Sequence, residues 1–348
     1  MQITRVDVEI SSAPKSHPVR DAIQLLDRNG HVRVRVQTDE GVSGRSDTYF
    51  GRVESSPRLL AAMIEELLGP AVVGADPFAV RAVRDRLWRL TDYQGSAGLT
   101  CFGIAAIDVA LWDLMGRALG QPVWRLLGAA RTSVPAYAMV GWLELDVDGL
   151  RQVAATAMEQ GFAGVKMKVG GGTLSDDVAR IRAVRDVIGA DAVLMVDANQ
   201  AFDFTEALRR GLAYQDLGCR WFEEPVPAAD TAAHLRLAQR LAIPIAAGEN
   251  RYGQRQFADL LAGGGLGVVQ PDLRRAGGLT DCLEIGLTAN AFGVPYASHG
   301  GGPHIHVLAA LPNTIYMECG LLPADGSVRL TDGCYPLPAE PGLSGPDD

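Results

Sequence analysis

The feature that most constrains the fold is a series of short apolar runs, rich in valine and isoleucine, that begins at Val134 and recurs at a period near 26 residues. Each run is followed by a stretch with helical periodicity. The runs cover 134–140, 164–169, 192–199, 219–225, 244–249, 266–272, 294–299 and 314–319. Eight strands that alternate with seven or eight helices predict an α/β fold with a closed parallel (β/α) barrel, the TIM-barrel architecture.

An open, doubly wound parallel sheet is the alternative fold. Such sheets usually stop at about five or six strands and carry a glycine-rich phosphate-binding turn after the first strand. The junction that follows the first run here, VPAYAMVGWLELD, has no such glycine pattern. The number of runs and this junction therefore favour the closed barrel.

The residues before the barrel have a different pattern. Residues 2–9 and 31–38 alternate between apolar and polar side chains, which predicts an antiparallel meander that includes a further short strand. Helical periodicity follows over 56–68, 77–90 and 98–119. The last of these helices has apolar residues on most of its faces, so we expect it to be buried between layers.

These patterns predict two domains. An N-terminal α+β capping domain covers 1–125, and a modified (β/α) barrel covers 126–319. The proline- and glycine-rich residues 320–348 are not needed to complete the barrel, and we expect them to return to the capping domain or to fray.

Charge and cysteine content exclude several classes of protein. The net charge of −9, from 32 basic and 41 acidic residues, argues against nucleic-acid and acidic membrane partners. The five cysteines include no C-x-x-C pair, which argues against a disulfide framework or a cysteine-rich zinc site. The N-terminus lacks the apolar core of a signal peptide, and no 18-residue apolar run occurs, so we expect a cytoplasmic protein without a membrane partner.

Acidic residues recur at the barrel period. Asp197, Glu223, Glu249 and Asp272 end successive runs and are spaced 26, 26 and 23 residues apart. The carboxyl ends of barrel strands face one mouth, so these side chains converge in space. Each could be an ordinary loop residue, but converging carboxylates repel one another unless a cation neutralises them. Hard oxygen ligands of this number predict a site for Mg²⁺ or a similar divalent ion.

The second run supplies two lysines to the same mouth. Lys166 and Lys168 point to one side of a strand, and Met167 points to the other. Burial, mutual repulsion and a nearby divalent cation are expected to lower the pKa of such a lysine, as a general base requires. The alternative is that both lysines extend to solvent.

The last two runs add an imidazole and a further carboxyl group. His299 ends the seventh run, 27 residues after Asp272, and a carboxylate that orients the ring makes it a competent acid or base. Glu318 ends the eighth run, 19 residues after His299, and could donate a hydrogen bond if it were protonated.

Several motifs resemble those of the enolase superfamily, and in particular its mandelate racemase branch. They are V-K-M-K in the second run, V-D-A-N-Q, W-F-E-E-P, A-G-E-N, the D-x-x-x-A-G-G-L-T run from Asp272 to Thr280, and S-H-G-G-G. Residues 110–128 look like the linker helix of that family, and the resemblance covers nearly the whole chain. Asp272 and His299 disfavour the muconate-lactonising and dipeptide-epimerase branch, which carries a lysine at the first position and no catalytic histidine.

The resemblance implies a role for each of these side chains. Asp197, Glu223 and Glu249 would be the Mg²⁺ ligands. Lys168 would be the base on one face of the substrate, and the dyad of His299 and Asp272 would be the acid or base on the other.

Three further residues would bind the substrate near its carboxylate. Lys166 would neutralise that carboxylate, and Glu318 would donate a hydrogen bond to one of its oxygens. Asn199 would contact the substrate or the metal shell.

The implied chemistry is Mg²⁺-dependent abstraction of the proton α to a carboxylate through a stabilised enolate. Loss of a β-hydroxyl group would make the enzyme a lyase that dehydrates an acid sugar to a 2-keto-3-deoxy acid. Reprotonation on the other face would make it a racemase or epimerase of a 2-hydroxy acid or related carboxylate. A rival of another class is a catalytically idle metal-binding protein. We expect a small-molecule carboxylate, an acid sugar, as the partner, and a homo-oligomer as the assembly.

In this family, substrate specificity comes from N-terminal loops that cap the barrel. Here the expected capping segments are 11–21 and 46–52, and they offer polar side chains for substrate binding: Lys15, His17, Arg20, Tyr49 and Arg52. A cap of this polarity would suit a polyhydroxylated acid better than an aromatic one. The alternative is that these side chains face water.

Overall fold

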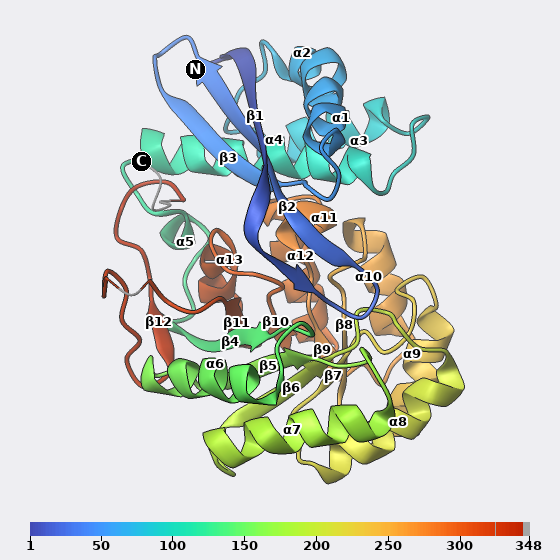
Figure 1. Ribbon diagram of the computed structural model, residues 1–348. Helices are drawn as coiled ribbons and strands as arrows, with labels where there is room; N and C mark the ends of the chain where they lie inside the picture. The colour runs from blue at the N-terminus through green and yellow to red at the C-terminus, as the bar shows by residue number, and fades with distance from the viewer. Residues whose placement is uncertain (324, 344–348) are drawn as a thin grey trace.

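A computed structural model of the protein describes residues 1–323 and 325–343 and contains a small sheet with helices above a closed barrel (Figure 1). The small sheet is antiparallel, in the order β1-β2-β3. Its strands are β1 (Ile3–Arg20), β2 (Leu25–Thr38) and β3 (Ser43–Tyr49). The helices beside it are α1 (Ser56–Met63), the π-helical turn η1 (Ile64–Leu68), α2 (Gly69–Val72), α3 (Val80–Leu90), α4 (Leu99–Ala118) and α5 (Val123–Leu126).

The first two strands are much longer than the sequence pattern predicts. Residues 11–21, expected to form a capping loop, belong almost entirely to β1, which pairs with β2 out to Arg20 opposite Leu25. A register shift between Pro14 and Val19 interrupts the pairing, since proline cannot donate to a ladder. The prediction failed because this part of the hairpin is largely exposed, so its residues do not alternate between apolar and polar.

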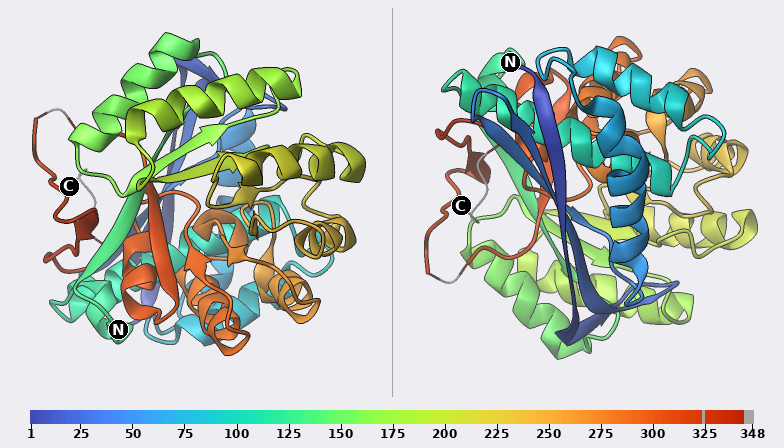
Figure 2. Two further views of the ribbon diagram at one scale, coloured as in Figure 1. Left: turned by 90° about the horizontal axis from the view of Figure 1, so that it is seen from below. Right: turned by 90° about the horizontal axis from the view of Figure 1, so that it is seen from above.

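The end of this hairpin reaches the barrel. The backbone N–H of Arg20 donates to Glu144 Oε2 at 2.8 Å, and the carbonyl of Arg20 accepts from Leu143 N at 2.9 Å. Ala22, in the turn, lies beside Gly170 in the loop after strand β5. Seen from above, the hairpin runs across the molecule (Figure 2), so a paired ribbon caps the loops at this side of the barrel.

The second expected capping segment, 46–52, is also largely strand. β3 extends to Tyr49, and Ser46 and Thr48 are buried. Its outward positions Arg45 and Asp47 are exposed. The alternation of β3 therefore directs one face toward α4 and the other away from it.

Helix α4 is the buried centre of the cap. It is long and apolar enough to cross a membrane by length and composition alone, but 89% of its most apolar window is buried inside this fold. It packs against β3 and β2 on one side and the barrel helix α11 on the other. The prediction of a helix buried between layers is therefore confirmed.

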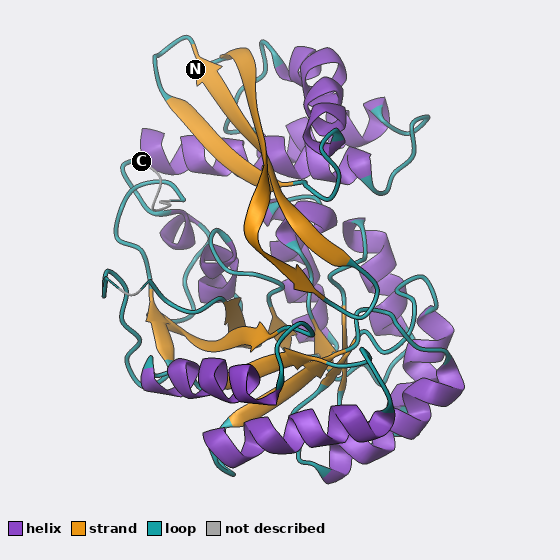
Figure 3. Ribbon diagram, viewed as in Figure 1, coloured by secondary structure: helices purple, strands orange, loops and turns teal. Residues whose placement is uncertain are grey.

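The barrel is formed by parallel strands β4 to β11, and it closes because β11 pairs with β4. The strands are β4 (Ser133–Gly141), β5 (Gly164–Lys168), β6 (Val193–Asp197), β7 (Phe222–Glu223), β8 (Ile245–Ala247), β9 (Val268–Val269), β10 (Tyr296–Ala297) and β11 (Thr314–Cys319). Helices surround them (Figure 3): α6 (Val147–Glu159), α7 (Leu174–Ile188), α8 (Phe204–Asp216), α9 (Thr231–Ala238), α10 (Gly253–Ala262), α11 (Leu273–Ala276), α12 (Leu279–Ala291) and α13 (His304–Ala310). The predicted closed barrel with an N-terminal cap is confirmed.

Several barrel strands are shorter than the apolar runs from which they were predicted. The prediction that Asp272 ends a strand is wrong. β9 ends at Val269, and Asp272 occupies the N-cap of α11. Pro271, which has no backbone N–H, separates the two elements. Glu249 and His299 likewise lie in the loops just after β8 and β10.

The C-terminal residues contact both parts of the molecule. β12 (Cys334–Pro336) pairs antiparallel with β4 at the edge of the barrel sheet, an element that the sequence did not predict. Further along, Gly342 pairs with Pro122, and Leu343 N donates to Asp113 Oδ1 at 2.8 Å on α4. Of the segment 320–348 that was expected to return to the cap, 324 and 344–348 lie outside the described residues. All five cysteines are free.

Candidate active site

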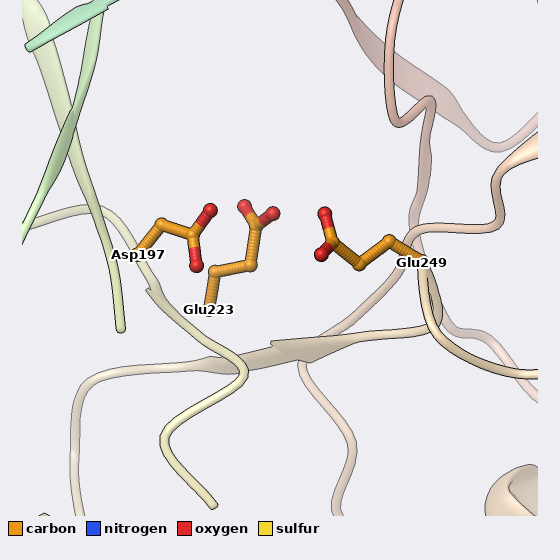
Figure 4. A group of neighbouring side chains, drawn as sticks. All are labelled: Asp197, Glu223 and Glu249. Carbon is orange, nitrogen blue, oxygen red and sulfur yellow. The ribbon is translucent and has the colours of Figure 1, made fainter. Parts of the chain in front are cut away.

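Three buried carboxylates converge at the mouth of the barrel. Asp197 is the last residue of β6, Glu223 is the last residue of β7, and Glu249 follows β8. One oxygen from each lies within 4.8 Å of the others, and the side chains point toward a shared space (Figure 4). Their exposed fractions are 0%, 1% and 5%. We call these residues the acidic triad.

Both predicted lysines point into this mouth, whereas Met167 between them belongs to the hydrophobic core. Lys166 is fully buried, and its Nζ donates to the Glu223 oxygens at 2.7 and 2.9 Å. Lys168 Nζ donates to Asp197 Oδ2 at 2.6 Å. It also lies 5.3 Å from the centre of the Trp142 ring, which covers it from the loop after β4. The alternative in which both lysines extend to solvent is wrong.

The charge state of the lysines depends on the carboxylates beside them. Burial by itself lowers the pKa of Lys166, but the neighbouring Glu223 and Glu318 carboxylates hold this pKa well above its usual value. In the same way burial lowers the pKa of Lys168, but Asp197, Glu249 and Glu223 together raise this pKa above its usual value. In these pairings attraction to carboxylates outweighs burial, and the lowered lysine pKa values expected beside a divalent cation stay a prediction.

The triad itself is not fully neutralised by these lysines. Burial and the adjacent Asp197 raise the pKa of Glu223 to about 8, despite the contact with Lys166. An acid whose pKa is raised in this way is stabilised by further positive charge nearby. The buried triad of hard oxygen ligands thus fits a divalent cation such as Mg²⁺.

His299 and Asp272 form a hydrogen-bonded pair, with His299 Nδ1 and Asp272 Oδ2 2.7 Å apart. The other Asp272 oxygen accepts from the backbone N–H groups of Arg274 and Arg275 at 2.7 and 3.3 Å, as an N-cap. His299 Nε2 lies 2.8 Å from Glu249 Oε2. Burial lowers the pKa of His299, but Glu249 and Asp272 together raise it well above its usual value.

Glu318 lies next to Lys166 and accepts a hydrogen bond from the Tyr137 hydroxyl at 2.8 Å. The backbone N–H of Gly300 also donates to it, at 3.2 Å. Burial raises the pKa of Glu318, but Lys166 and His299 outweigh burial and bring this pKa to about 2. In this arrangement Glu318 is an ionised acceptor, so the hydrogen-bond donation inferred from the resemblance would require it to gain a proton.

Asn199 also lies at the triad. Its side-chain amide donates to Glu249 Oε1 at 3.5 Å, and its backbone N–H donates to Asp197 Oδ1 at 2.8 Å. The residue has a positive φ of 44°, which asparagine tolerates better than most residues. The turn after β6 therefore links two members of the triad.

The structure does not bring the five cap residues into this cluster. Lys15 lies over the Tyr49 ring, 5.6 Å from its centre, and the Tyr49 hydroxyl donates to a backbone carbonyl of β2. His17, Arg20 and Arg52 are exposed. Within the described residues, none of the five makes a hydrogen bond or ion pair with the triad or the dyad, so their role in substrate binding remains a prediction.

Sequence reasoning missed aromatic and amide groups inside the barrel that support the triad. Trp221 Nε1 donates to Glu223 Oε2 at 3.2 Å, and Gln270 Nε2 donates to the Tyr137 hydroxyl at 3.1 Å. Trp221 precedes Glu223 by two residues and therefore faces the same side of its strand. That parity is the signal that could have identified it.

Glu224 follows Glu223 directly in the chain, but it does not join the triad. It is fully buried, with a positive φ of 35°. Asn250 Nδ2 donates to Glu224 Oε2 at 2.6 Å and to Glu249 Oε1 at 2.9 Å. The guanidinium of Arg275 donates to the Glu249 carbonyl at 3.0 Å. Glu224, Asn250 and Arg275 thus hold the loop that carries the third triad member.

The fold and this site together define a (β/α)-barrel protein with a candidate metal centre and flanking acid–base groups at its mouth. Two family descriptions match the chain: the mandelate racemase / muconate lactonizing enzyme N-terminal domain over residues 5–128, and the enolase C-terminal domain-like family over residues 149–345. The chain therefore belongs to the mandelate racemase and muconate lactonizing enzyme family of the enolase superfamily.

Individual relatives are similar over nearly their whole length. The chain is 30% identical to an arabinonate dehydratase from Saccharolobus solfataricus, over 93% of this chain and 91% of the relative. It is 33% identical to a 3,6-anhydro-alpha-L-galactonate cycloisomerase from Streptomyces coelicolor, over 89% and 87%. A racemase from Streptomyces coelicolor, solved with bound magnesium, has a TM-score of 0.92 and 31% identity, covering 98% of this chain and 96% of that one.

Proposed function

We propose that the protein is a Mg²⁺-dependent lyase that abstracts the proton α to the carboxylate of an acid sugar and eliminates water to give a 2-keto-3-deoxy acid. The observation that carries this proposal is the placement of two proton-transfer groups at opposite ends of the triad. Lys168 contacts Asp197, and His299 contacts Glu249. A substrate held at the triad would thus meet a candidate base and a candidate acid.

We assign the metal to Asp197, Glu223 and Glu249, and the bound magnesium of the structurally similar racemase supports Mg²⁺ as the ion. When bound, a divalent cation would supply positive charge that stabilises the enolate form of the substrate carboxylate. The remaining steps depend on side chains of the chain itself.

Lys168 is proposed to remove the α-proton, and His299, oriented by Asp272, to protonate the departing β-hydroxyl group. Lys166 is proposed to neutralise the substrate carboxylate with its positive charge. Glu318 and Asn199 are proposed to position that end of the substrate.

Racemisation or epimerisation is the second candidate. Lys168 and His299 would also catalyse this reaction if His299 returned a proton to the opposite face of the enolate and no hydroxyl group were released. The similarity to a solved racemase and to a cycloisomerase supports keeping this candidate. The similarity to an arabinonate dehydratase, which aligns over most of both chains, supports elimination.

A panel of acid sugars incubated with the enzyme and Mg²⁺ in D₂O tests the proposal by ¹H NMR. Dehydration gives a 2-keto acid with deuterium at C3, and Lys168→Ala abolishes it. Exchange of the α-hydrogen without any keto acid would favour the racemase. Absence of both, in a protein that still binds Mg²⁺, would indicate the idle metal-binding alternative.

We further propose that the enzyme acts in the cytoplasm as a homo-oligomer on a small-molecule carboxylate. Size-exclusion chromatography with light scattering tests the assembly, and a single monomer peak would contradict it.

A further inference from the structure

A small cavity of about 30 Å³ lies beside His299, between β3 of the cap and the loops after β9 and β10. Its lining includes Asp47, Arg274 and His304 as well as the dyad. A cavity of this size holds about two water molecules. His299 lines this cavity and also contacts Glu249 of the acidic triad, so the cavity adjoins the acidic site.

His304, which lines the cavity, carries a buried donor without a partner. His304 is 4% exposed, and its Nε2 accepts the backbone N–H of Leu273 at 2.9 Å. Burial lowers the pKa of His304 to about 3, so the ring is neutral. Because Nε2 is the acceptor, the proton lies on Nδ1. Among the described residues Nδ1 has no hydrogen-bond partner, and an unsatisfied buried donor of this kind costs free energy unless a ligand satisfies it.

A second side chain that lines the cavity, Arg274, is positively charged. The Arg274 side chain is half-buried at the cavity and makes no hydrogen bond or ion pair within residues 1–323 and 325–343. The acids that line the same cavity are already satisfied. Asp47 is paired with His31 at 2.8 Å and with Arg33 at 3.1 Å, and Asp272 is paired with His299. The charge that remains available to a ligand is therefore positive.

We infer that this cavity is a subsite for the second carboxylate of a sugar diacid, with Arg274 as the specificity-determining residue and His304 Nδ1–H as a supporting donor. A guanidinium and a neutral N–H donor match the two oxygens of one carboxylate, and the space of about two waters fits them. The terminal hydroxyl group of a sugar monoacid offers one oxygen and no charge, so it leaves Arg274 without a counter-ion. This inference rests on the proposed function, because it takes the other carboxylate of the substrate to lie at the triad.

The test compares two sugar acids that differ only at the last carbon, such as galactarate and galactonate, or whichever such pair the panel shows to react. The wild-type enzyme is expected to prefer the diacid in kcat/KM by at least roughly 10-fold. Arg274→Met is expected to lower kcat/KM for the diacid by roughly 10- to 100-fold, mainly through KM, and to change the monoacid value by less than about threefold. Arg274→Lys should restore part of the diacid preference, since it keeps the charge.

Arg182→Met is the matched control, because Arg182 is exposed on α7 and its loss removes the same charge without touching the cavity. An Arg274→Met effect that is equal for both acids, or absent for both, would overturn the subsite. If neither acid is turned over, the proposed dehydration is contradicted. The subsite can then still be tested by calorimetry, which measures the binding of the two acids with Mg²⁺ present. Tighter binding of the diacid by wild type, lost in Arg274→Met, supports it, and equal binding overturns it.

Discussion

Two of the places where the protein buries acidic side chains stabilise them in different ways. At the barrel mouth the acidic triad is surrounded by cations, with Lys166 against Glu223 and Lys168 against Asp197. At the seam between cap and barrel, Asp108 of α4 accepts hydrogen bonds from the Thr280 backbone N–H at 3.1 Å and from its hydroxyl at 2.5 Å. Asp108 is 3% exposed.

The acidic triad must keep its negative charge to hold a cation, whereas Asp108 need not be charged. Burial raises the pKa of Asp108 to about 7, and its partners are neutral donors of Thr280. Trp112 Nε1 also donates to the Thr280 hydroxyl at 2.9 Å, so the seam is a chain of hydrogen bonds across two domains. The mouth instead sets ionised groups against one another, and the triad carboxylates face a shared space. Buried acids alone therefore do not mark an active site, whereas buried acids with paired lysines do.

The largest expected contrast is in activity. Lys168→Ala should lower kcat for dehydration by roughly 10³-fold, because it removes a proton-transfer group. Asp108→Asn, at the other acidic cluster, should change kcat by less than about threefold, since it keeps the acceptor oxygen. Steady-state assays of 2-keto acid formation measure both, and equal losses in the two variants would erase the distinction between the clusters.

The next contrast is the pH dependence of stability. The folded-state pKa of Asp108, raised from 3.8 to about 7, lies above its unfolded value. The stability tied to its proton is therefore full below pH 4 and is lost as the pH rises through about 7, by up to about 4 kcal/mol. Urea unfolding from about pH 4 to pH 8 should show this decline for wild type.

Asp108→Asn cannot ionise, so the part of the decline that belongs to Asp108 should disappear in it. At pH 8.5 the variant should consequently unfold at a higher urea concentration than wild type. A variant whose stability falls with pH as steeply as that of wild type would place the titration elsewhere.

Mg²⁺ should stabilise the folded protein through the acidic triad at the barrel mouth and not through Asp108. At a concentration of about 100 times its Kd, a ligand that binds only the folded state stabilises it by about 2.7 kcal/mol. Thermal unfolding with and without Mg²⁺ should show this gain in wild type and in Asp108→Asn, and chelation should remove it. Glu223→Gln should lose most of the gain, because it removes one charged ligand, and a full Mg²⁺ response in that variant would contradict the metal assignment.

The smallest contrast concerns one hydrogen bond of the seam. Trp112→Phe keeps most of the buried ring but removes the indole N–H that reaches Thr280. The expected cost is about 1 kcal/mol in the free energy of unfolding, with kcat unchanged. Chemical denaturation with a parallel activity assay checks both numbers. A large loss of activity would mean that the seam also positions Asp272 of the dyad, which lies eight residues before Thr280.

The barrel and the approach of its acidic residues could be predicted because both follow from repetition. One strand and one helix separate Asp197 from Glu223 and Glu223 from Glu249, and a closed parallel barrel brings such positions to one mouth. The same holds for the contact between Asp272 and His299, although Asp272 caps a helix and does not end its strand.

Other features depend on contacts that local patterns do not encode. The exposed hairpin over 11–21 has no apolar alternation to reveal it, and β12 forms only because the edge of β4 is available. The raised pKa of Lys168 depends on which carboxylate its ammonium group touches, a distance that a strand period cannot supply. The seam between Asp108 and Thr280 joins residues far apart in the chain, with no shared motif.

The central claim is that the mouth, through Lys168, removes an α-proton from the substrate. The most direct test is the rate of α-hydrogen exchange in D₂O for the reactive acid sugar, measured in wild type, His299→Asn and Lys168→Ala with Mg²⁺ present. The account predicts that His299→Asn still exchanges the α-hydrogen but forms keto acid at least roughly 10²-fold more slowly, and that Lys168→Ala does neither. Exchange at the wild-type rate in Lys168→Ala would contradict the account.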